Sequence, residues 1–92
     1  MKKELPEHIQ MLDGKAVITL SREAEIGGAK VKTLTMREPT VDDQIAAEKL
    51  GTTGEADKQY MANLCMVTPA EVGRLPLRDF KRLREAFDFF TD

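Results

Sequence analysis

Few side chains in this sequence are of a type and spacing that could carry out acid–base or nucleophilic chemistry. Asp42 and Asp43 are adjacent carboxylates, but successive side chains on a helix diverge by about 100° and do not converge on one substrate atom. Capping of a helix is therefore the favoured interpretation. Ser21 lacks a nearby histidine and the glycines of a nucleophile elbow, and Cys65 lies between apolar residues without a basic activating group. We predict no catalytic residue.

Metal and cofactor sites are not predicted either. His8 is the single histidine in the sequence, and a metal centre normally needs several convergent ligands. Gly27 and Gly28 lack the longer glycine pattern that cradles phosphate groups, so we interpret them as turn residues. We therefore expect no cofactor and no enzymatic activity.

A basic run near the end of the sequence is the best candidate for contact with nucleic acid. It consists of Arg78, Lys81, Arg82 and Arg84. Lys81 and Arg84 are each followed four positions later by an acidic residue, Glu85 and Asp88, with which they could pair on a helix. This internal balance favours a solvated helix face over a phosphate-binding surface.

Aromatic residues in the same region are candidates for binding a protein partner. Phe80, Phe87 and Phe90 fall on one side of a predicted helix, whereas Phe89 projects to nearly the opposite side and should be exposed unless something covers it. The candidate partner-binding residues are Phe87, Phe89, Phe90 and Met66, the last of which points off the apolar face of its own helix. Core packing or a dimer contact remains the alternative for the aromatic residues.

The elements that would position these residues begin with a β-hairpin, predicted over residues 15–37. Apolar and polar residues alternate from Ala16 to Leu20, as in a half-buried strand, and Gly27 and Gly28 suit the turn. On the return strand the apolar pattern changes phase, which predicts a bulge near Lys32 or Thr33. Residues 1–14 are expected to be a flexible polar leader.

Helices are predicted at about residues 41–50, 55–67, 69–75 and 77–90. Pro39 ends the hairpin, Thr40 suits the N-cap of the first helix and Gly51 suits its C-cap. This helix lacks a single apolar stripe, so we expect it to pack centrally on more than one neighbour. The predicted fold class is α+β: an N-terminal β-hairpin followed by three to four short helices in one small domain, residues 15–92.

Composition agrees with a globular protein. Of the 92 residues, 41% are hydrophobic and 33% are charged, and the formal net charge of -2 gives no overall field that would attract nucleic acid or an anionic membrane. A single cysteine, no signal-peptide segment and no run of about 20 apolar residues lead us to expect a protein of the cytoplasm, neither exported nor embedded in a membrane.

The segment "GGAKVKTLTMREPTVDDQIAAEKL" resembles the phage tail assembly proteins of the Mu-like type, within the tail assembly chaperone family of contractile-tailed phages. The motif residues are Leu34, Arg37, Glu38, Pro39, Thr40 and Asp43. The resemblance continues through "MVTPAEVGRLPLRDF", in which Leu-Pro precedes an Asp and an aromatic residue, and it covers about residues 15–90. We interpret the motif as a fold signature, and we expect Arg37 and Glu38 to bridge the hairpin to the helices.

The resemblance implies a non-enzymatic chaperone that binds the tape measure protein and keeps it soluble during tail tube assembly. Such a protein would act in the cytoplasm of the bacterial host and be absent from the mature virion. A frameshifted longer form of the protein and a second copy of the chain are further partners that the family allows. Two alternatives stay open: a small nucleic-acid-binding regulator that uses the basic C-terminal helix, and a minor virion structural component.

Overall fold

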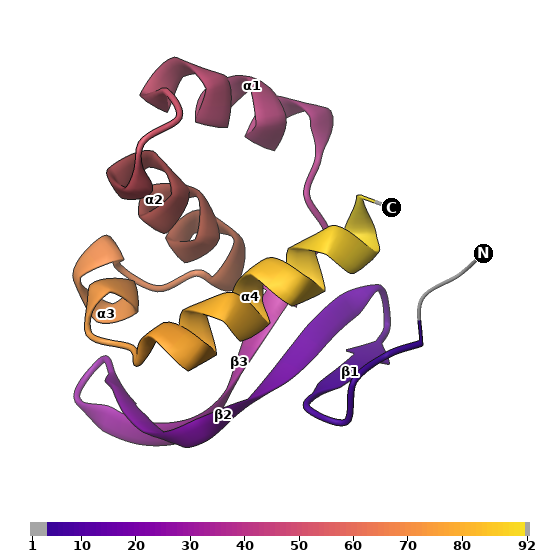
Figure 1. Ribbon diagram of the computed structural model, residues 1–92, viewed down its shortest axis with the longest axis vertical. Helices are drawn as coiled ribbons and strands as arrows, with labels where there is room; N and C mark the ends of the chain where they lie inside the picture. Colours follow the sequence, from indigo (N-terminus) through magenta and orange to yellow (C-terminus); the bar gives the residue numbers. More distant parts are fainter. Residues whose placement is uncertain (1–3, 92) are drawn as a thin grey trace.

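The computed structural model describes residues 4–91, in which three strands precede four helices (Figure 1). The strands are β1 (Ile9–Leu12), β2 (Lys15–Ile26) and β3 (Ala29–Arg37), and the helices are α1 (Val41–Leu50), α2 (Gly54–Cys65), α3 (Pro69–Gly73) and α4 (Leu77–Phe90). The predicted α+β class is confirmed. Two helices end two residues earlier than predicted; α2 stops at Cys65 because Met66 adopts a left-handed backbone with φ of 58°.

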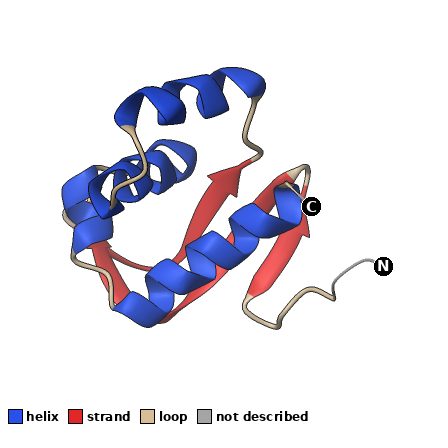
Figure 2. Cartoon of the chain, turned by 45° about the horizontal axis from the view of Figure 1, so that its top comes forward, coloured by secondary structure: helices blue, strands red, loops and turns tan. Residues whose placement is uncertain are grey.

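The prediction of a flexible leader over residues 1–14 is wrong from Ile9 onward; residues 1–3 lie outside the described part. Ile9–Leu12 pairs antiparallel with the start of β2, so the described sheet has the order β1-β2-β3 (Figure 2). Asp13 and Gly14 connect the strands with φ of 51° and 75°, as in the two-residue turn that Asp-Gly favours. Ile9 is buried in the core, so the sheet gives this short segment a partner and a place to bury its apolar side chain.

The hairpin of β2 and β3 spans the predicted residues and turns at Gly27 and Gly28, whose φ angles are 60° and 84°. Such positive values carry no Cβ penalty in glycine. Glu71 of α3 accepts a hydrogen bond from the Gly27 amide at 2.7 Å. The tip of the hairpin is thereby fixed to α3.

A break in register divides this hairpin near Lys32, as predicted. Pairing on β2 jumps from Thr19 to Ala24, while only Lys32 separates the matching positions on β3. The extra residues, 20–23, therefore lie in β2 rather than in the return strand. Asp79 and Arg82 of α4 bind to this irregular segment and the residue before it.

The core lies between one face of the sheet and the helices α2 and α4, which Figures 1 and 2 show on the same side of the strands. Alternation along the strands directs their apolar residues to this face. The buried cluster contains Ile9, Ala16, Ile18, Leu20, Leu34 and Met36 from the sheet, Met61, Leu64 and Cys65 from α2, and Leu83 and Ala86 from α4.

The predicted central place for α1 is wrong. None of its residues is buried, and Val41 at its start is 77% exposed. Figure 1 shows α1 beyond α2, on the side away from the sheet. The lack of an apolar stripe explains this position, because α1 has no continuous apolar face to bury against the core.

Candidate functional site

Arg37 joins the end of β3 to the first turn of α1. Its Nη2 donates to Oδ1 of Asp43 at 2.8 Å, and its Nη1 donates to Oδ2 of the same carboxylate. Two parallel hydrogen bonds make this a bidentate pair, the strongest geometry for arginine and carboxylate. Arg37 therefore forms the bridge expected between hairpin and helices. Glu38 does not: within the described residues its side chain has no hydrogen bond or ion pair, and it is exposed.

Thr40 and Pro39 serve the same junction, whereas Leu34 serves the core. The backbone N–H of Thr40 donates to Asp43 Oδ2 at 2.8 Å, and Thr40 Oγ1 accepts from the Asp43 backbone at 3.2 Å, which completes a capping box. Leu34 is buried in the core. Pro39 has no amide hydrogen with which to continue the β3 ladder. The motif thus holds β3 and α1 in fixed relation.

The Arg37–Asp43 pair changes the titration of both groups. The hydrogen bonds from Arg37, more than those from Thr40, hold the pKa of Asp43 well below its usual value against an opposing effect of burial. The pKa of Arg37 is raised for the same reason. A carboxyl with a lower pKa in the folded state stabilises the fold above the unfolded value of about 4, and this contribution is lost as the pH falls through the folded pKa.

Asp79 forms a second junction, which the sequence reading missed. Its carboxylate is fully buried and accepts from the Ser21 backbone N–H at 2.8 Å and from Ser21 Oγ at 3.0 Å. Ser21 lies in the irregular segment of β2, whose own ladder pairing is interrupted there. Asp79 replaces part of that pairing. It is also the Asp that follows Leu-Pro in the segment "MVTPAEVGRLPLRDF". The sequence signal that could have revealed this junction was the presence of an Asp in the first turn of a predicted amphipathic helix.

The predicted pairs of the basic run with Glu85 and Asp88 do not form along α4, although Arg82 Nε lies 4.0 Å from Asp79 Oδ1 within the same helix. Arg84 lies 3.0 Å from Asp57 of α2 rather than pairing with Asp88. Arg82 donates from Nη1 to the Thr19 carbonyl at 2.7 Å, beside the register break. Two of the four basic side chains therefore connect α4 to other elements.

The N-terminal segment covers one flank of α4. His8 Nε2 donates to Glu85 Oε1 at 2.7 Å, so Glu85 pairs with His8 rather than with Lys81. Phe89 follows Glu85 by about one turn on this flank, and it is half-buried against the core rather than exposed. Phe89 was expected to be exposed unless something covered it, and its partial burial against the core meets that condition.

The remaining candidate partner-binding residues differ in exposure. Met66 is 83% exposed. Phe87 and Phe90 are half-buried against the core, and the Phe87 ring meets Tyr60 of α2 edge-on, with centroids 5.3 Å apart. Of the four candidates, Met66 alone presents most of its side chain to solvent.

The potential nucleophiles have inactive surroundings. Burial raises the pKa of the Cys65 thiol to about 12, so the thiol stays protonated at neutral pH. The Ser21 hydroxyl is committed to Asp79 at 3.0 Å. Both side chains serve packing or structure in this fold.

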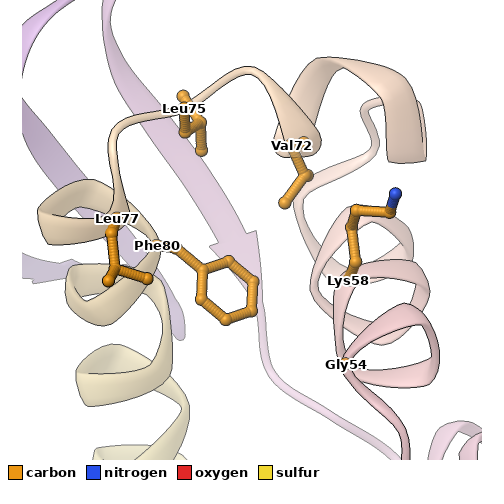
Figure 3. A pocket seen from close by; sticks show the side chains of 7 residues that line it. Gly54, Lys58, Val72, Leu75, Leu77 and Phe80 are labelled. Atoms are coloured by element: carbon orange, nitrogen blue, oxygen red, sulfur yellow. The ribbon is translucent and has the colours of Figure 1, made fainter.

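Two of the cavities beside α4 are lined by α2 as well. The first, named here the Phe80 cavity, has a volume of about 240 Å³ and is lined by Gly54, Lys58, Val72, Gly73, Leu75, Leu77 and Phe80 (Figure 3). In Figure 3 the Phe80 ring extends from α4 across the gap that separates α4 from Lys58 and Val72. Apart from the amine of Lys58, its walls are apolar.

The second, named here the Phe87 cavity, has a volume of about 360 Å³ and lies where α1, α2 and α4 meet. It is lined by Gln44, Ala47, Glu48, Gly51, Thr52, Asp57, Tyr60, Met61, Arg84 and Phe87. Its walls combine the Tyr60–Phe87 aromatic pair with charged groups at the rim. The sequence predicted a binding role for Phe87. It could not predict the cavity, because residues from three helices form it.

The polar groups of the two junctions hold elements of the fold together, and each of the two cavities carries apolar side chains in its lining. The chain belongs to the family described as phage tail assembly chaperone proteins, E, or 41 or 14, which matches residues 17–92. Curated proteins and solved structures give no match. The protein is thus a phage tail assembly chaperone, and membership implies a protein partner. Between residues 4 and 91 no helix has the length and apolarity needed to cross a membrane.

Proposed function

We propose that the protein binds the tape measure protein of its phage and keeps it soluble until the tail tube polymerises around it. The single observation that carries the proposal is family membership over residues 17–92. It acts without catalysis, in the host cytoplasm, and leaves before the virion is complete.

Exposed apolar side chains support a binding role. Leu77 is 69% exposed and Phe80 beside it is only half-buried, whereas isolated domains gain stability by burying residues of this kind. Before the tail tube forms, the helices of the tape measure protein expose apolar faces to water. A groove that accepts an amphipathic helix would cover such a face.

Commitment of the polar groups supports a role without catalysis. Asp43 is held by Arg37 and Thr40, and Asp79 is held by Ser21. A general acid or base must be within reach of a substrate proton. Both carboxylates instead hold structural hydrogen bonds.

Co-expression with the tape measure protein tests the proposal. We expect the tape measure protein to be soluble and to co-purify with this protein, because its apolar segments are covered. The matched control is the same plasmid with a stop codon at the start of the chaperone gene, from which the tape measure protein should be recovered in aggregates. Equal solubility in both cases, without co-purification, would rule out the proposed function.

The nucleic-acid alternative is weaker because Arg82 and Arg84 are already bound to Thr19 and Asp57. Within the basic run only Arg78 and Lys81 remain for phosphate contacts, and few such contacts give weak, salt-sensitive binding. DNA binding at low salt that is lost on replacing Arg78 and Lys81 would favour this alternative.

A further inference from the structure

The Phe80 and Phe87 cavities lie along one side of α4. The two phenylalanines are seven residues apart, so they project in nearly the same direction and are separated by about 10.5 Å along the helix axis. Helix α2 lines both cavities, with Lys58 at the first and Met61 at the second. Arg84 and Asp57, which form an ion pair at 3.0 Å, both line the Phe87 cavity.

We propose that the two cavities form one binding site, the α2–α4 groove, for an amphipathic α-helix of the tape measure protein. The bound helix has apolar side chains seven residues apart, one for each cavity, and acidic residues beside the one that enters the Phe80 cavity. This inference rests on the proposed function for the identity of the partner. It adds which surface of this protein binds, and that the bound segment is helical and acidic near one end.

The spacing of the cavities matches a helix. Residues i and i+7 on an α-helix lie on one face about 10.5 Å apart, which equals the separation of Phe80 and Phe87 along α4. An extended strand would span that distance in about three residues, an odd interval that directs the two side chains to opposite faces. The groove therefore favours a helical occupant.

Exposed apolar surface marks where the helix would enter. Leu77 is 69% exposed although it lies at the edge of the Phe80 cavity, and Phe80 is half-buried beside it. Figure 3 shows both side chains on the wall that faces Val72 and Lys58. An apolar side chain placed between these walls would remove Leu77 and Phe80 from water at once.

Charge differs between the two ends of the groove. The Phe80 end carries Lys58 at its wall, whose amine pairs with Glu55 at 3.1 Å. Lys81, one turn after Leu77, is exposed and has no ion pair within residues 4–91. The Phe87 end carries Glu48 at its wall and the exposed Asp88 on α4. Complementary charge steers and orients partners, so acidic residues of the helix belong at the Phe80 end.

Binding of synthetic peptides provides the test. Overlapping 25-residue peptides that cover the tape measure protein are titrated against the full chain by fluorescence anisotropy, beside co-purification with the whole tape measure protein. For the peptide that binds, Leu77→Asp should raise Kd by about tenfold or more, because a charge replaces an apolar contact. Lys81→Glu should weaken binding less, and its effect should shrink as salt is added.

The controls are Met66→Asp and Val41→Asp, which place the same charge at residues 83% and 77% exposed that line neither cavity. Both should bind like the wild type. Circular dichroism checks that each variant is folded; Leu77 is largely exposed at the start of α4, where an acid is favourable.

Each outcome decides a different point. If wild type and Leu77→Asp bind equally, or Met66→Asp is the variant that weakens binding, the groove is wrong while the proposed function stands. If the whole tape measure protein co-purifies but no peptide binds, a helical occupant is wrong. A wild-type dimer that Leu77→Asp dissociates would make a second copy of the chain the occupant. Failure of wild type to bind tape measure protein in any form overturns both proposals.

Discussion

Asp79 is fully buried, although carboxylates seldom are unless they are paired. It is the acceptor for two donors of Ser21, in a part of β2 that lacks regular ladder partners. Arg82, one turn later, donates to the Thr19 carbonyl in the same region. At the residue scale, α4 therefore stabilises an irregular strand by polar contacts, while its apolar side chains fill the core.

Replacing Asp79 by Ala should lower the free energy of unfolding by about 1 to 3 kcal/mol, because two hydrogen bonds from the half-buried Ser21 to a fully buried carboxylate would be lost. Urea unfolding measures the loss. The control is Asp88→Ala on the exposed side of α4, for which a change within about 0.5 kcal/mol is expected. If Asp79→Ala unfolds at the wild-type midpoint, its hydrogen bonds to Ser21 do not stabilise the fold.

Separation along the chain decides which residue contacts the sequence could reveal. The capping role of Thr40 and the acids after it were predictable because the partners are three residues apart. The contact of Asp79 with Ser21 spans 58 residues and depends on where α4 crosses the sheet. Local hydrogen bonds follow from local backbone geometry, whereas distant ones require the tertiary fold.

At the scale of elements, the starts of α1, α3 and α4 were predicted correctly, because proline and threonine act through the adjacent backbone. β1 was missed because four residues give little periodicity, and its strand depends on the edge that β2 offers. The peripheral place of α1 was missed for a related reason. A helix without an apolar stripe has no preferred partner that its sequence can identify.

Helix α1 should open without unfolding of the rest. It buries no residue, and its attachment relies on the Arg37–Asp43 pair, on a 3.4 Å hydrogen bond between Tyr60 and Gln44, and on limited packing against α2. Elements with few buried apolar contacts exchange their amides through local opening. We expect amide hydrogens of α1 to exchange at least about tenfold faster than those of α2 and α4 in hydrogen-exchange mass spectrometry.

Arg37→Ala should accelerate exchange further in α1 alone, because it removes the link to β3. Arg78→Ala, which removes an exposed arginine with no ion pair within residues 4–91, is the matched control and should change nothing. Protection of α1 equal to that of the core helices in the wild type would show that α1 belongs to the cooperative unit.

At the scale of the whole molecule, the candidate site forms only where separate helices pack together. The sequence identified Phe87 and the amphipathic character of α4, but each cavity is formed by α4 with α2 and a third helix, α3 at the Phe80 cavity and α1 at the Phe87 cavity. Leu77 gave no signal of its own, since a single exposed leucine is common on protein surfaces. Its importance emerges only beside Phe80 and Val72 (Figure 3).

The size of the groove bears on how long the partner stays. If a single helix contacts the chaperone through these two cavities of about 240 and 360 Å³ alone, the interface is small, and small interfaces tend to be transient. Tube subunits that polymerise around the tape measure protein would compete for the same apolar helix faces and displace the chaperone. Mass spectrometry of purified phage particles should therefore detect the tape measure protein but not this protein, while infected-cell lysates sampled before tail completion contain both. Its presence in washed particles at a constant ratio to the tape measure protein would instead make it a structural component of the virion.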